Sequence, residues 1–412
     1  MERGAYAQSG ANAELALKLI ERLPEGIERV RAELGVRLLE GTGVAALYGV
    51  GSTERLDTFE RVCQLSEPLG DAPALFRGLL NTGFAHTQRF ETPGALEIGR
   101  RCVKLAEQDP NREMLPAAQS LLAQALYRSG DLLQAASVHS DAMRGFVSAY
   151  QPAARLVPAN PWAVTPVTFA LVEQVLGRPD EALKLAGEAL RRALQLKHLF
   201  TLTGVMYTAC VLRYQRREPE ALHELVEAQI ALAEEHGFRE FLASGRALRA
   251  WAMIELAQTV QGVAELETAA TSMPRLFQIP KSLMLAEVYL HVGRSQEAIA
   301  IIGEELARIK QSGAHLEEAE LYRLKGEAIL MRDSSTTAAA EECVRKAIEI
   351  AKGQSAKWWE LRATVSLARL LRDAGRRDEA RAMLADVYNW FTEGFDTPDL
   401  KDAKTLLDEL EN

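Results

Sequence analysis

The stretch that decides the fold is "LAQALYRSGDLLQAA", residues 122–136. It carries Leu-Ala in an apolar run, then Gly130-Asp131, then Ala135 five residues after the glycine. Small residues on both sides of a Gly turn predict a tight helical hairpin, because helices pack closest where side chains are smallest and Gly ends the first helix in a left-handed cap. Three further stretches keep this order: "FALVEQVLGRPDEAL" (169–183), "LAEVYLHVGRSQEAI" (285–299) and "LARLLRDAGRRDEAR" (367–381).

Weaker copies extend the pattern over most of the chain. We place them at Gly83/Phe90/Ala95, at Ala209/Arg216/Ala221, at Ala250/Ala257/Gly262 and at Gly326/Ala340, the last with Asp333-Ser334-Ser335 in a longer turn. The second small residue then falls at 95, 135, 182, 221, 262, 298, 340 and 380. These intervals exceed the roughly 34 residues of a tetratricopeptide repeat and overlap armadillo and HEAT repeats. A further small residue follows seven positions after the second one, as Ala189 follows Ala182. This order of small residues favours tetratricopeptide hairpins with longer helices.

We therefore predict an all-α, right-handed superhelix (solenoid) of about nine tetratricopeptide-like hairpins and a C-terminal capping helix, because apolar residues recur at helical spacing and no segment alternates like a strand. Residues 1–412 are expected to form one array: a junction helix within 1–23, hairpins over 24–391 and the cap over 397–410, with Thr397 as N-cap. The first hairpin is placed at roughly 24–43 and 53–69. The longest irregular stretch, 150–161, is expected to be functional or mobile.

Composition excludes several classes of protein. The chain has 57 acidic and 48 basic residues and a net charge of −9, which argues against binding a nucleic-acid backbone. No apolar run reaches the roughly 20 residues of a membrane span, and charges such as Glu14 and Lys18 exclude a secretory signal. The four cysteines form no C-x-x-C pair, so we expect neither disulfides nor zinc, and a cytoplasmic location.

We find no catalytic, cofactor or metal motif, and we expect the protein not to be an enzyme. No Walker or G-x-S-x-G motif occurs, and His223-Glu224 is followed by Glu227 where a zinc helix needs a second His. Adjacent acids such as Glu317-Glu318 are interpreted as solvated helix faces, because neighbouring helix residues do not face each other.

The binding surface is expected on the first helix of each hairpin, which lines the concave side of such a superhelix. The inward positions lie three residues before, one residue after and four residues after the small residue of that helix. Aromatic and Arg side chains there have the composition of a binding hot spot. The alternative is that Trp162 and Trp251 only fill gaps between helices. The candidates for a binding groove are Gln124, Tyr127, Trp162, Met206, Arg213, Trp251, Glu287, Arg323, Glu327 and Arg369.

The C-terminal part resembles a known family. The stretches "EAELYRLKGEAIL" (318–330) and "WFTEGFDTPDLKDAKTLL" (390–407) are similar to the tail of bacterial signalling ATPases of the AAA/STAND type. Those proteins join a nucleotide cyclase or DNA-binding domain to an ATPase and a tetratricopeptide region. "SGANAELALKLIERLPEG" (9–26) resembles the junction from ATPase to repeats. The resemblance implies a regulatory arm that senses a small molecule or partner protein; maltose-regulator relatives bind a sugar there.

The sequence departs from that architecture in having no Walker motif, cyclase aspartates or helix-turn-helix, so it resembles the repeat region alone, as a fragment or a free-standing paralogue. Asn160-Pro161-Trp162 also stands where family members tend to carry Asp-Pro-Gly.

The leading hypothesis is a non-catalytic sensor and scaffold that binds a protein segment, peptide or small effector in its concave groove. The alternative is a structural module for self-association of the parent protein, as a homo-oligomer without a ligand groove. RNA binding and enzymatic activity rank below both.

Overall fold

The structure, a computed structural model, describes residues 2–148, 156–272 and 278–411, and it contains helices and no strands within these ranges. Part of the stretch 150–161, expected to be functional or mobile, lies outside the described residues. The helices are α1 (Glu2–Ile20), α2 (Ile27–Tyr48), α3 (Thr53–Leu69), α4 (Ala72–Gln88), α5 (Thr92–Glu107), α6 (Leu115–Ser129), α7 (Leu132–Gly145), α8 (Pro161–Leu176), α9 (Pro179–Leu196), α10 (Leu199–Gln215), α11 (Pro219–His236), α12 (Arg239–Glu255), α13 (Thr259–Ser272), α14 (Gln278–His291), α15 (Ser295–Ser312), α16 (Glu318–Arg332), α17 (Thr337–Gly353), α18 (Lys357–Asp373), α19 (Arg377–Tyr388) and α20 (Pro398–Glu411).

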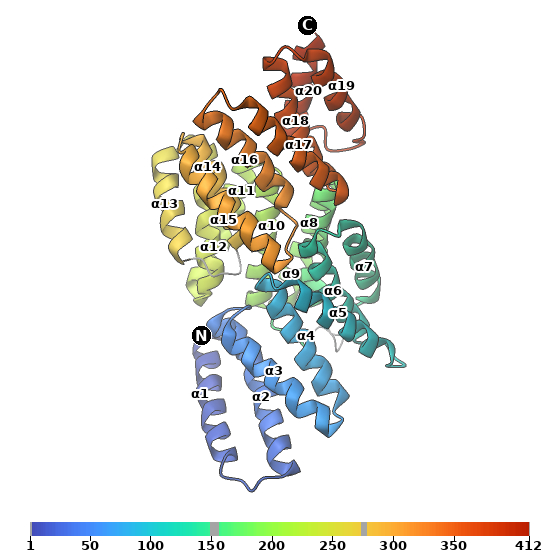
Figure 1. Cartoon of the computed structure of the whole chain (residues 1–412). Coiled ribbons are helices and arrows are strands. Elements are labelled where there is room, and N and C mark those ends of the chain that lie inside the picture. Colours follow the sequence, from blue (N-terminus) through green and yellow to red (C-terminus); the bar gives the residue numbers. More distant parts are fainter. Residues whose placement is uncertain (1, 149–155, 273–277, 412) are drawn as a thin grey trace.

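Consecutive helices pack as antiparallel hairpins that stack into a curved array (Figure 1). The first hairpin is α2/α3 and the ninth is α18/α19, while α1 packs on α2 and α20 packs on α18 and α19. From α4 to α18, the first helices of successive hairpins also contact each other, and α18 contacts the capping helix α20. These helices form a continuous inner wall. The predicted all-α superhelix of tetratricopeptide-like hairpins is confirmed. Within the described ranges, no helix combines the length and the apolar character that crossing a bilayer requires.

The turn inside each hairpin requires a residue in the left-handed region. Gly130, Gly177, Gly293 and Gly375 have φ between 77° and 90°. Phe90 and Ala257 adopt the same region at φ 59° and 65°, at the positions predicted for the weaker copies. A side chain in this region costs roughly 1 kcal/mol, which explains why glycine marks the clear copies.

One weak copy was assigned one residue out of register. In the α10/α11 turn the left-handed residue is Arg217, with φ 55°, and not Arg216. Leu222, which is fully buried, therefore takes the position that we predicted for Ala221. The small residue of α10 that faces its partner helix is then Cys210 instead of Ala209, and every inward position on this helix moves by one.

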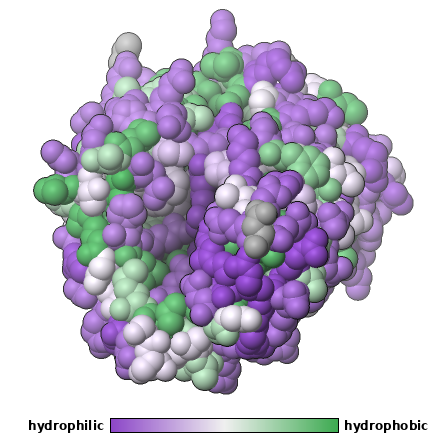
Figure 2. Space-filling view, turned by 90° about the horizontal axis from the view of Figure 1, so that it is seen from above, coloured by the Kyte–Doolittle hydropathy of each residue, from purple (hydrophilic) through white to green (hydrophobic). Residues whose placement is uncertain are grey.

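Successive turns of the superhelix touch along a seam between turns and loops. The Leu316 N–H donates to the Arg128 carbonyl (3.3 Å), and the Asp180 N–H donates to the Glu393 carboxylate (3.1 Å). Nearer the N-terminus, the Val50 N–H donates to the carboxylate of Glu240 on α12 (3.0 Å). Helix α8 also packs directly against α18. The array is thus closed on itself, and its hollow, visible from above, is narrow (Figure 2).

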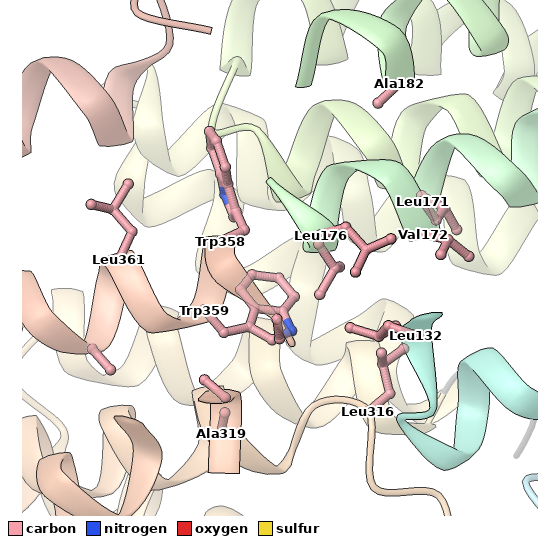
Figure 3. Packing of buried hydrophobic residues seen from close by; sticks show 14 of the residues in the cluster. Leu132, Leu171, Val172, Leu176, Ala182, Leu316, Ala319, Trp358, Trp359 and Leu361 are labelled. Carbon is pink, nitrogen blue, oxygen red and sulfur yellow. The ribbon is translucent and has the colours of Figure 1, made fainter. Parts of the chain in front are cut away.

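The largest hydrophobic cluster crosses this seam. It joins buried residues of α6 to α10 with buried residues of α16 to α20. Figure 3 shows Trp359 of α18 extending toward Leu176, Leu132 and Leu316, whereas Trp358 points away. Because these contacts link segments far apart in the sequence, the two ends of the array share one core.

The last helix begins as predicted, with Pro398 as its first residue after Thr397. The Thr397 hydroxyl donates to the Gly394 carbonyl (2.6 Å), so it fixes the preceding turn. Leu400, Ala403 and Leu406 are buried against α18 and α19, while the opposite face of the helix is exposed.

Candidate functional site

A cavity of about 190 Å³, here called the central cavity, lies inside the superhelix. The first helix of every hairpin from α4 to α18 contributes to its wall, together with the α2/α3 turn and the segment before α8. This position follows from the fold, because the first helices face the inside of the array. Among the described residues, Arg55 at the start of α3 is the one lining residue that comes from a second helix. The prediction that they line the inner side therefore agrees with where the cavity lies.

Aromatic side chains dominate the wall of the central cavity. Phe200 and Phe241 meet edge to face with ring centroids 5.5 Å apart, and Tyr207 lies 6.0 Å from Phe241. Amide and hydroxyl groups are interspersed among the rings, including Ser120 and Gln124. Such a wall offers a large apolar contact area with a few polar groups to orient an occupant. The aromatic residues that line it are Phe84, Tyr127, Phe200, Tyr207, Tyr214, Phe241 and Trp359.

Three of the ten predicted groove residues, Gln124, Tyr127 and Glu287, line the central cavity. Three others, Arg323, Glu327 and Arg369, line a second, polar pocket of about 210 Å³ between α16, α18 and α20. The remaining four, Trp162, Met206, Arg213 and Trp251, line neither pocket.

The residues outside the pockets have other partners. Trp251 is buried and meets Tyr214 edge to face, with centroids 5.0 Å apart, so it fills the space between α10 and α12. Arg213 pairs with Glu218 in the α10/α11 turn. The Trp162 ring lies under the Arg192 guanidinium, 4.8 Å from the ring centroid. Trp251 therefore matches the gap-filling alternative, whereas Trp162 and Met206 are partly buried.

The register correction accounts for the misplaced residues of α10. Counting from Cys210 instead of Ala209 gives Tyr207, Val211 and Tyr214 as inward positions, and all three line the central cavity. The misassigned turn residue thus explains the error on α10. It does not explain α12, where the same rule gives Trp251, which lines neither pocket.

The C-terminal part of the inner wall carries a largely buried charge cluster, here called the arginine network, in which the side chains of Arg217 and Glu327 are partly exposed. Arg323 pairs with Glu320 (3.0 Å) and Glu327 (2.7 Å). Arg362 pairs with Asp399 (2.8 Å) and Glu320 (3.4 Å). Arg217 lies 3.8 Å from both Glu287 and Asp399. The members of the network are Arg217, Glu287, Glu320, Arg323, Glu327, Arg362 and Asp399.

These charges stabilise one another. Burial alone would raise the pKa of Asp399, yet it is lowered because Arg362 and Arg217 lie beside the carboxylate. The pKa of Glu327 is lowered against burial by Arg323 and by a hydrogen bond from Ser366. The Tyr214 hydroxyl donates to Glu287 (2.9 Å). Buried carboxylates that keep their charge in this way act as paired structural groups.

Glu317, just before α16, behaves differently. It is 4% exposed, and burial raises its pKa to about 7, although Arg128 lies 3.8 Å away and opposes the rise. The prediction that Glu317-Glu318 forms a solvated face is wrong for Glu317, because Leu316 docks on Arg128 and draws Glu317 into the cavity wall. Glu318 instead pairs with His315 (2.8 Å) and is partly exposed.

Other wall residues were also missed by the sequence analysis. Gln215 falls at the end of α10 and Trp359 at the start of α18, outside the three inward positions of either helix. The prediction that Trp359 is a packing residue agrees with its place in the largest hydrophobic cluster, but Trp359 also lines the cavity. No local pattern marks these residues, because the closure of the superhelix brings them to the cavity. Among the described residues, no group of three His, Cys, Asp or Glu side chains is placed to hold a metal ion.

Comparisons with known proteins agree with the fold. A family model described as tetratricopeptide repeat matches residues 361–386, within the ninth hairpin. A search of the curated proteins found no match.

Two solved structures share the architecture. One is a Rap protein complexed with competence and sporulation factor, at 11% identity and a TM-score of 0.51, covering 92% of this chain and 99% of that chain. The other is the Cut9–Hcn1 hetero-tetramer of the APC/C, at 12% identity and a TM-score of 0.55, covering 97% of this chain and 67% of that chain.

A STAND protein with a tetratricopeptide repeat sensor from Pyrococcus horikoshii is similar at 11% identity and a TM-score of 0.42, covering 88% of this chain and 55% of that chain. That similarity is too low to carry an argument, and at these identities the first two show the fold alone. The chain is thus a tetratricopeptide-type helical array whose inner wall encloses an aromatic cavity.

Proposed function

We propose that this protein is a non-catalytic sensor that binds a peptide, a protein segment or a small effector in its central cavity. The observation that carries the proposal is the composition of the wall: one partly open cavity is lined by the first helices of eight hairpins and by seven aromatic side chains. Concave, mostly apolar sites with a few polar groups are where proteins bind ligands. The Rap protein of similar fold was solved with competence and sporulation factor, which supports this use of the fold.

The geometry suggests how binding would be sensed. The central cavity is lined by α4 and α6 on one turn of the superhelix and by α16 and α18 on the next. An occupant that contacts both turns binds the closed arrangement better than an open one, so it shifts the population toward closure. Following the sequence resemblance, we propose that this closure is the signal that a regulatory arm passes to a signalling ATPase.

A cavity-blocking variant tests this function. Gly204 lies on α10 at the cavity wall, and a Cβ there would be in ordinary contact, 3.4 Å, with Phe241. Gly204→Leu should fill the cavity, while replacing a helical Gly favours the helix. Gly187→Leu on α9 is the matched control, because nothing lies within 4 Å of a Cβ at that exposed position.

The measurement is a thermal-shift screen of short peptides and small metabolites against the parent and both variants. A ligand at 100 times its Kd should stabilise the parent and Gly187→Leu by about 2.7 kcal/mol and leave Gly204→Leu unshifted. Hits that stabilise all three proteins equally would place binding outside the cavity.

One observation favours the second candidate, self-association. Apolar side chains along α1 and the start of α2 are exposed, with Leu15 at 59%, Leu19 at 53% and Ile27 at 54%. Exposed apolar patches of this kind mark interaction surfaces. Leu15→Glu/Leu19→Glu should then lower the mass seen by concentration-dependent light scattering, without changing ligand binding. A parent that stays monomeric at all concentrations would remove this candidate.

A further inference from the structure

Four of the described residues in the wall of the central cavity each carry a buried polar atom without a hydrogen-bond partner, and one of them is Arg55, at Nε, among the N-terminal hairpins. The other three atoms are Oε2 of Glu317, Oε1 of Gln215 and Nε1 of Trp359. All three side chains are more than nine-tenths buried. A buried polar atom without a partner is costly, and buried groups in native proteins are almost always paired. Three such atoms in one cavity wall indicate that a ligand supplies their partners.

The three residues belong to one corner of the cavity. The Tyr127 side chain lies beside Gln215 and Glu317, and the charge of Glu317 adds to the effect of burial in raising the Tyr127 pKa. The Arg362 guanidinium lies over the Trp359 ring, 5.2 Å from its centroid, and donates to the backbone carbonyl of Gln215. Tyr127 and Arg362 thus connect the carboxyl, the amide and the indole.

The open groups define the chemistry of the occupant. Glu317 and Gln215 offer two acceptors, one of which belongs to a carboxyl group, so they call for a donor, and a cation fits them best. The Trp359 N–H is a donor and calls for an acceptor next to that cation. The aromatic rings nearby favour a cation at their faces and an apolar side chain beyond it.

The cations that face this corner are already engaged. Arg362 is paired with Asp399 and Glu320, and Arg128 lies over the Phe90 ring (4.7 Å) and faces the other oxygen of Glu317. Arg55 has an unpartnered Nε, but its guanidinium is held by Asn81 and the Val50 carbonyl on the wall of the N-terminal hairpins. The acids Glu287 and Glu320 also line the cavity. An anionic ligand would therefore meet carboxyl groups at this corner.

We propose that the central cavity recognises a free α-amino group followed by a carbonyl, the chemistry shared by the N-terminus of a peptide and by an amino acid amide. The ammonium group binds Glu317 and Gln215, the carbonyl accepts from Trp359, and the side chain packs among the tyrosines and Phe241. This inference rests on the proposed function, which places the ligand in the central cavity, and it adds the class of ligand.

The test is a calorimetric titration with matched probes near neutral pH. L-phenylalaninamide carries both the free amino group and the carbonyl. Its N-acetyl derivative lacks the positive charge, and 3-phenylpropanamide lacks the amino group. We expect phenylalaninamide to bind with a Kd on the order of 1 mM and at least about tenfold more tightly than either analogue. The peptide Phe-Gly-Gly amide separates the two sources: tighter binding than phenylalaninamide identifies a peptide N-terminus, and weaker binding an amino acid amide.

Two variants locate the contact. Glu317→Gln should weaken phenylalaninamide binding about tenfold and leave the acetylated probe unaffected, while the neighbouring Glu318→Gln should change neither. If Glu317→Gln folds poorly, Trp359→Phe provides the second arm, because it keeps a ring and removes the N–H. That variant should lose the preference for phenylalaninamide over phenethylamine, which has no carbonyl.

The outcomes separate this inference from the function beneath it. In one outcome, phenylalaninamide, its acetylated derivative and 3-phenylpropanamide all bind equally well, and Gly204→Leu blocks their binding. That result would overturn the ligand class and keep the cavity as a binding site. Binding of phenylalaninamide that persists in Glu317→Gln and Trp359→Phe would also overturn it. No saturable binding of any probe would count against both proposals.

Discussion

The middle and the C-terminal third of the inner wall use equivalent positions for opposite purposes. On α10 the three inward positions are Tyr207, Val211 and Tyr214, and they border the central cavity. On α16 the equivalent Arg323 and Glu327 are paired with each other and belong to the arginine network. Charged side chains on an inner wall are thus no sign of a binding surface when they neutralise one another. The unpartnered groups lie where the aromatic wall meets the network.

The largest effect is expected from breaking the network. Arg362→Met leaves Asp399 and Glu320 buried with fewer cations, and removing one partner from buried charges costs about 3–5 kcal/mol. Arg369→Met is the control, because its pair with Asp402 is nearly half exposed and contributes less than about 1 kcal/mol. Denaturation midpoints of both variants check this, and equal losses would show that the network is not structural.

Next in size is the seam that encloses the cavity. Gly177 has φ 90°, and a Cβ there would lie 2.7 Å from the Trp390 ring and 3.0 Å from Phe391 on the next turn of the superhelix. Gly177→Ala should cost about 2–4 kcal/mol from backbone strain and overpacking. Gly293→Ala has similar strain with nothing within 4 Å, so about 1 kcal/mol is expected. The melting temperatures of the two variants test this difference. An equal loss of stability in both variants would mean that successive turns of the superhelix do not touch at Gly177.

The pH dependence of stability sharpens the contrast between paired and unpaired carboxyls. Burial raises the pKa of Glu317 to about 7, above its unfolded value near 4.5. The folded state therefore favours the protonated form, and this contribution is complete below about pH 4.5 and lost as pH rises through 7. It amounts to about 3 kcal/mol.

Comparing Glu317→Gln with the parent isolates this contribution, because Glu240 has its pKa raised into the same range in both proteins. The parent should lose about 3 kcal/mol more than the variant between pH 4.5 and 8 in chemical denaturation. Parallel pH profiles would indicate that Glu317 is solvated.

The smallest effect is expected at a residue that the sequence assigned to the groove. Arg213 makes a partly exposed pair with Glu218 and lines neither pocket. Arg213→Ala should change the free energy of unfolding by less than about 1 kcal/mol and leave binding of phenylalaninamide unchanged. A clear loss of affinity by calorimetry would restore Arg213 to the binding site.

The sequence predicted the hairpins well because their determinants are local. Glycine turns and small residues at fixed spacing identify which helices pair, and even Phe90 and Ala257 took their predicted turn positions. The site was only partly predictable. Gln124, Tyr127 and Glu287 follow from the spacing rule. Glu317 reaches the cavity because Leu316 docks on Arg128 from the next turn, and Gln215 and Trp359 line it from positions outside the rule. Long-range closure leaves no periodic mark, and a single degenerate turn was enough to displace the inward positions of α10.

A crystal structure of the protein with phenylalaninamide would show whether the unpartnered groups of the cavity wall bind this ligand. We expect the ligand in the central cavity, with its ammonium group within hydrogen-bond distance of Glu317 Oε2 and its carbonyl facing Trp359 Nε1. A ligand bound elsewhere, for example on the exposed apolar residues of α1, or a cavity left unchanged at saturating concentration, would contradict it.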